Sequence, residues 1–158
     1  MPTIATNYFD KLTELEKEEI KEAGKVFGDV KLYEYIQKGA GLEEFIKFIL
    51  SDFNLKNLIR DAIIWDGFKL LLQKIFSVIT KKTNKPTEIQ VWIEDKNNPA
   101  SVNIALSIKK IEDIQELMVS LKAKLEVEIF SVSKEQQKGK IFWITLDKDS
   151  QNWLVKIL

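Results

Sequence analysis

Two chemically versatile residues are missing from this sequence, whose 158 residues include no histidine and no cysteine. Imidazole and thiolate are common ligands of transition metals and common groups in acid–base and nucleophilic catalysis. Their absence excludes a Ser-His-Asp triad, a Cys-His nucleophile, a zinc finger, a thiolate-bound iron–sulfur cluster and a disulfide. We therefore expect the chain to fold without a metal or a covalent crosslink.

Arginine is almost absent as well. Arg60 is the one arginine among 24 basic residues, and 24 acidic residues balance them. Proteins that bind nucleic acids usually present an excess of positive charge to the phosphates, and arginine supplies most of the two-pronged contacts to phosphates and guanine. The sequence therefore predicts no nucleic-acid partner.

Long apolar runs and cofactor motifs are also lacking. No stretch reaches 18 uncharged apolar residues, and the first residues lack the pattern of a secretory signal, so we expect no membrane span and a cytoplasmic location. The six glycines never form G-x-G-x-x-G, and the turn at residues 39–41 lacks the lysine and hydroxyl residue of a phosphate-binding loop. No cofactor and no metal site are predicted.

What is present is the composition of a folded globular protein. Apolar residues make up 45% of the chain and charged residues 30%, and a chain of this length can bury most of its apolar surface. The hydrophobic period changes near residue 84, from helical spacing before it to alternation after it. We expect a single domain over residues 1–158, with a helical part at about 1–84 and a ββαββ part at about 85–158.

The predicted helices of the first part begin with residues 10–23, where Thr13 and Glu16 form a capping box and Gly24 is a stop signal. Residues 54–80 carry two apolar stripes and form the longest predicted helix, which must be covered on more than one side.

Two further segments of the first part are also assigned to helices. Residues 42–53 place apolar side chains on one helical face. Residues 26–41 suit a helix or a strand, and a helix ending at Gly39 is preferred.

The second part predicts an antiparallel sheet. Its segments are strands at residues 88–94 and 102–108, a helix at 111–124, strands at 125–132 and 140–146, and a short helix within 149–158. Segregation of helices from hairpins is typical of the α+β class. The helices at about 10–80 should pack on one face of this ββαββ sheet.

Candidate binding residues lie on the first predicted strand of this sheet. Strand alternation puts Gln90, Trp92 and Glu94 on one side and the aliphatic residues between them on the other. Trp92 is then either an exposed recognition anchor or a residue covered by a helix of the same chain. Glu94 and Lys96 also have the Glu-x-Lys spacing of metal-dependent nucleases, although an ordinary hairpin turn contains the same residues.

Three functional hypotheses follow. The first is a non-enzymatic module, such as an adaptor, an inhibitor, an immunity protein or a regulatory subunit, that binds another protein through one sheet face or through the glutamate-rich helix at residues 10–23. The second is a small-ligand sensor with an apolar pocket ending near Trp92. The third is a Mg²⁺-dependent phosphodiesterase that uses Glu94 and Lys96. Association with a second copy of the chain is left open.

Overall fold

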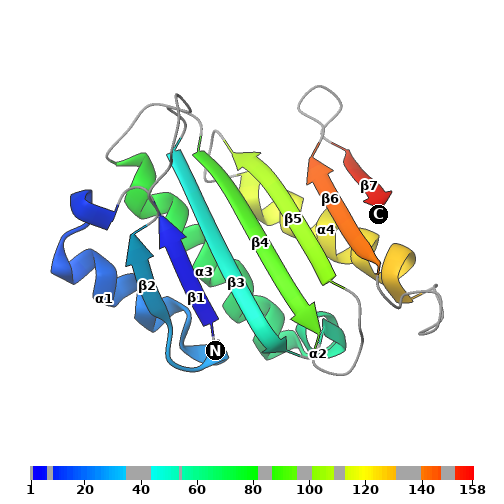
Figure 1. The fold of residues 1–158 in the computed structure, drawn as a ribbon, viewed down its shortest axis with the longest axis horizontal. Coiled ribbons are helices and arrows are strands. Elements are labelled where there is room, and N and C mark those ends of the chain that lie inside the picture. The colour runs from blue at the N-terminus through cyan, green and yellow to red at the C-terminus, as the bar shows by residue number, and fades with distance from the viewer. Residues whose placement is uncertain are drawn as a thin grey trace.

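The computed structural model describes residues 2–6, 9–34, 44–53, 55–81, 87–95, 101–108, 113–130, 140–146 and 152–158. Seven described strands form one sheet in the order β2-β1-β3-β4-β5-β6-β7 (Figure 1). The strands are β1 (Pro2–Thr6), β2 (Lys31–Glu34), β3 (Glu44–Phe53), β4 (Thr87–Asp95), β5 (Ser101–Ile108), β6 (Ile141–Leu146) and β7 (Trp153–Ile157). The helices are α1 (Glu14–Ala23), α2 (Leu55–Arg60), α3 (Ala62–Thr80) and α4 (Asp113–Phe130), with short 3-10 turns η1 (Phe9–Lys11) and η2 (Lys25–Phe27). The α+β class predicted from the sequence is confirmed.

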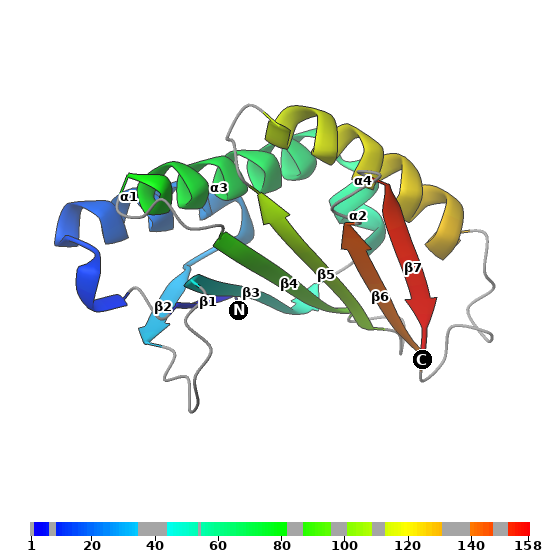
Figure 2. The ribbon, with the colours of Figure 1, turned by 90° about the horizontal axis from the view of Figure 1, so that it is seen from above.

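The helices α1, α3 and α4 all lie on the same side of the sheet (Figure 2). In β4, Ile89, Val91 and Ile93 are at most 1% exposed and point toward these helices, as the alternation predicted. The residues between them point to the opposite side, which no described helix covers. We call that side the bare face.

Three pairs of parallel strands are each joined through a helix: β1 and β2 through α1, β3 and β4 through α3, and β5 and β6 through α4. The crossovers from β3 to β4 and from β5 to β6 both step toward β7, and their helices lie on the same side of the sheet (Figure 1). However, β5 is antiparallel to β4, so the two crossovers begin from strands of opposite direction. They therefore have opposite hands, although parallel crossovers strongly prefer one hand.

The burial pattern explains this exception. The buried apolar side chains of β5 and β6 lie on the same side as those of β4; they are Val102, Ile104, Phe142 and Ile144. The apolar stripe of α4, which includes Leu121 and Leu125, can be buried only against that side. Hydrophobic burial thus outweighs the preference for one crossover hand.

An aromatic cluster ties the helical layer to the sheet. Phe48 of β3 stacks on Phe68 of α3 at 6.4 Å between ring centroids, and Phe27 of η2 contacts both rings edge-on. Trp65 extends the cluster, with its ring centroid 5.6 Å from that of Phe68. Such edge-on and stacked pairs add about 0.5–1.5 kcal/mol each beyond the area that they bury.

The helix predicted at residues 10–23 is confirmed as α1, together with its capping box. The Thr13 hydroxyl accepts from the Glu16 amide at 3.1 Å, and the Glu16 carboxylate accepts from the Thr13 amide at 2.9 Å. The long helix predicted at 54–80 is instead divided into α2 and α3 at Asp61. Asp61 has extended backbone angles, and its carboxylate accepts from the amides of Ile63 and Ile64, so it caps a new helix.

The prediction that the region before residue 80 is helical is wrong in three places. The segment 42–53, assigned to a helix, contains the strand β3 from Glu44 onward. The segment 26–41, for which a helix is the preferred prediction, contains β2, and residues 35–41 lie outside the described ranges. The lead before residue 10, for which no element is predicted, contains β1. In β3, Ile46, Phe48 and Leu50 are buried with a period of two, because alternation turns every second side chain toward the helices. Parallel pairing with β4 and antiparallel pairing with β1 hold the segment as a strand.

The second part of the chain also departs from prediction. The strands at 88–94 and 102–108 are confirmed as the antiparallel pair β4 and β5. However, residues 125–130 continue α4, and the predicted terminal helix is replaced by β7, which pairs with β6. The sheet is therefore mixed and not the antiparallel sheet expected, since β5 and β6 are parallel. Among the described helices, none is long and apolar enough to cross a membrane.

Candidate functional site on the bare face of the sheet

A row of side chains crosses the middle of the bare face. Strand register pairs Ile49 of β3 with Trp92 of β4, Trp92 with Asn103 of β5, Asn103 with Trp143 of β6, and Trp143 with Lys156 of β7. Trp92 and Trp143 are partly exposed, and Asn103 between them is only 2% exposed. Two tryptophans thus flank one buried amide on a sheet surface.

A second row runs beside the first, two residues along each strand. It consists of Lys47, Gln90, Ala105, Thr145 and Leu154. The small Ala105 lies at its centre, and polar or long side chains surround it. The bare face therefore has an aromatic middle with polar residues around it.

The Trp92 indole is held by contacts with its neighbours. Its Nε1–H donates to the Glu94 carboxylate at 2.9 Å, and the Lys47 ammonium lies 5.8 Å from the ring centroid. The first contact fixes the edge of the ring, and the second places a cation near its face. These two contacts restrict the orientation of the Trp92 indole.

Two buried polar atoms on this face have no hydrogen-bond partner in the described part of the chain: Oδ1 of Asn103 and Nε1 of Trp143. They belong to residues that face each other across β5 and β6. A buried polar atom without a partner costs about 1–3 kcal/mol, so natural proteins retain few of them. The bare face thus contains two buried polar atoms without a partner among the described residues.

The three residues singled out from the sequence lie together in the structure. Gln90, Trp92 and Glu94 share the bare face, and Glu94 contacts Trp92 directly. Sequence reasoning did not find Trp143 or Asn103. Both follow from alternation, because Trp143 lies between the buried Phe142 and Ile144, as Asn103 lies between two buried aliphatic residues of β5.

The one carboxylate proposed for metal chemistry, Glu94, has a structural contact in the described residues, because it accepts the hydrogen bond of Trp92. Lys96 lies outside the described residues. Within the described ranges, no group of three acidic side chains is arranged to hold a metal ion.

The glutamates of α1, the other surface proposed for a partner, are engaged within the protein. Four form ion pairs, namely Glu14–Lys17 at 3.2 Å, Glu18–Lys21 at 3.6 Å, Glu22–Lys25 at 3.6 Å and Glu19–Lys74 at 2.8 Å. The fifth, Glu16, closes the capping box. The helix therefore presents alternating charges and not an acidic stripe.

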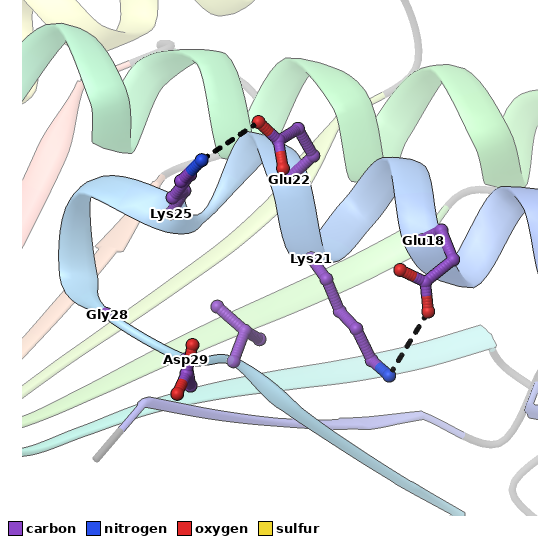
Figure 3. A pocket seen from close by; sticks show the side chains of 7 residues that line it. Glu18, Lys21, Glu22, Lys25, Gly28 and Asp29 are labelled. Carbon is purple, nitrogen blue, oxygen red and sulfur yellow. Dashed lines mark ion pairs between the residues drawn. The ribbon is translucent and has the colours of Figure 1, made fainter.

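Two hollows lined by described residues lie on the helical side of the molecule. The first, of about 350 Å³, is lined by charged residues of α1 and by the segment that follows it, and two of the ion pairs named above join residues of this lining (Figure 3). The second, of about 440 Å³, lies between α3 and α4, where Lys122 stands 5.8 Å from the Trp65 ring centroid. Neither hollow includes Trp92, near which the ligand-sensor hypothesis placed its pocket.

Comparison with known proteins gives no relative from which a role could be transferred. The chain matches no protein-family model, no curated protein and no solved structure. The functional interpretation consequently depends on the geometry and chemistry of the bare face itself.

Proposed function

We propose that this chain is a non-enzymatic protein-interaction module that binds another protein through the bare face of its sheet. The observation that carries the proposal is the pair Trp92 and Trp143, partly exposed on a face that no described helix covers. Tryptophan, like tyrosine and arginine, is enriched at binding hot spots, and it supplies a large rigid apolar surface.

The composition of the face indicates the kind of partner. Lys47 of β3 and Lys156 of β7 lie on strands that flank those of the two tryptophans, and Glu94 lies near Trp92, so charges of both signs surround the aromatic middle. A partner with a flat or shallow apolar surface and a mixed polar rim would complement this pattern. Because the glutamates of α1 are paired within the protein, we favour the bare face, and not the first helix, as the binding surface.

The test is capture of a partner from host lysate with matched variants. We expect wild-type protein to retain a stoichiometric partner, and Trp92→Ala and Trp143→Ala each to weaken binding by about 2 kcal/mol, roughly 30-fold in Kd. Leu70→Ala is the control, since Leu70 is a large apolar residue on α3, 56% exposed and away from the bare face.

The variants distinguish binding through the bare face from binding through the helical side. Loss of the partner with both tryptophan variants, with retention in the Leu70 variant and unchanged melting temperatures, supports the proposal. Full retention by the double variant Trp92→Ala, Trp143→Ala would overturn it. Loss with Leu70→Ala alone would assign binding to the helical side.

A further inference from the structure

The outer strand β7 has the features of a pairing edge. It is last in the sheet order and pairs with β6 alone among the described strands. Leu154 is 54% exposed, Ile157 is 49% exposed and Leu158 is 53% exposed, and Lys156 is the single charged residue of the strand. Natural sheets protect their edges with charges, prolines or bulges, and β7 has only one lysine.

The opposite edge of the sheet differs. β2 is four residues long, and Lys31 and Glu34 at its two ends carry opposite charges. Short charged strands resist pairing with other chains. The apolar edge of this sheet is therefore β7.

The hydrogen bonds to β6 show which backbone groups of β7 point outward. Ile141 and Leu158 exchange both of their amide-to-carbonyl bonds, at 3.1 and 2.9 Å. In an antiparallel pair such bonded residues alternate with non-bonded ones, so Lys156 and Leu154 also bond to β6. The N–H and C=O groups of Trp153, Val155 and Ile157 then point away from the sheet.

We propose that β7 pairs with β7 of a second copy of this chain, antiparallel and about a two-fold axis at Val155. In this register Val155 bonds to the partner copy's Val155, and Trp153 bonds to the partner copy's Ile157, so all three outward residues exchange both bonds. Lys156 faces Leu154 of the other copy. An axis at Lys156 would oppose two lysines, and an axis at Leu154 would set Ile157 opposite a position outside β7.

A hydrogen bond to α4 holds β7 in position. The Trp153 indole Nε1–H donates to the Ser120 hydroxyl at 2.8 Å, and that hydroxyl donates to the Leu117 carbonyl at 3.0 Å.

The dimer would form one continuous sheet with both bare faces on the same side, because the two-fold axis of an antiparallel strand pair is perpendicular to the sheet. This inference does not rest on the proposed function. It depends only on β7.

The first test is amide hydrogen exchange of the wild-type chain at low and at near-millimolar concentration. We expect the outward amides of Trp153, Val155 and Ile157 to become protected only at high concentration, whereas those of Leu154 and Lys156 are protected at both. In parallel, sedimentation should show the mass rising toward twice the 18.3 kDa of one chain. Equal exchange of the outward amides at both concentrations would overturn the proposal.

The second test uses proline at adjacent positions. Val155→Pro removes an N–H that β6 does not use, and proline is tolerated on edge strands with that side facing outward, so we expect a folded monomer. Val155→Thr retains the N–H and should still dimerise. Leu154→Pro removes an N–H that β6 uses and should lower the melting temperature. A Val155→Pro variant that still dimerises would refute the register.

Discussion

Replacing Asn103 with leucine should make the protein more stable. Asn103 is 2% exposed, and its Oδ1 has no partner among the described residues, so folding removes that oxygen from water without compensation. An unsatisfied buried acceptor costs about 1–3 kcal/mol, and leucine has nearly the same shape without the polar atoms. We expect the free energy of unfolding to rise by about 1–2 kcal/mol. For a domain of this size, Tm should rise by about 2–4 °C for each kcal/mol.

Urea and thermal unfolding followed by circular dichroism measure this change. Asn57→Leu is the control, because Asn57 is exposed on α2 and a surface change should stay within about 0.5 kcal/mol. A lower free energy of unfolding for Asn103→Leu would refute the reasoning. It would mean that the amide oxygen accepts a hydrogen bond in solution, from water or from a side chain that has moved.

Three further substitutions test the local interactions that hold the fold, each by urea denaturation. Asp61→Ala removes the cap of α3 and should cost about 1 kcal/mol, and an unchanged midpoint would show that the break between α2 and α3 needs no cap. Ser120→Ala leaves the indole N–H of Trp153 without its acceptor and should cost about 1–3 kcal/mol, whereas Ser120→Thr should recover most of the loss. Gly67→Ala would place a Cβ 2.4 Å from Cγ1 of Val26 and should destabilise the protein despite the better helix propensity of alanine. Adding Val26→Ala removes that methyl group and should reduce the loss, and additive effects would contradict the contact.

Local signals predicted the elements whose formation is decided locally. The capping box at Thr13 and Glu16 and the stop at Gly24 are short-range interactions, and α1 begins and ends as they indicate. The alternation of β4 likewise predicted which side would be buried. In both cases the interacting residues are neighbours in sequence.

Elements decided by distant partners were predicted wrongly. In β3 the apolar residues satisfy a helical stripe and a strand alternation at once, and pairing with β1 and β4 decides between them. Residues 125–130 alternate like a strand, yet they continue α4, because the helix has already begun and Leu125 packs in its apolar stripe. β7 was assigned to a helix because its pairing with β6 is not visible in its own five residues.

The candidate site was predicted in part for the same reason. Gln90, Trp92 and Glu94 were found because they lie on one strand. Trp143 and Asn103 lie on other strands, and only the pairing of β4, β5 and β6 brings them into the same row. The residues around Trp143, IFWIT, are almost all apolar, so the sequence alone does not show which of them face the core. Sequence reasoning therefore identifies one strand of the face and not the face.

The division of the molecule into a helical side and a bare side also divides its tryptophans. Trp65 and Trp153 are each 6% exposed on the helical side, whereas Trp92 and Trp143 lie on the bare face. The indole emission of this chain should accordingly contain a blue-shifted, shielded component and a component open to quenchers such as iodide. Occupation of the bare face would suppress quenching of the second component alone, so the protein carries an intrinsic optical reporter for each of its two sides.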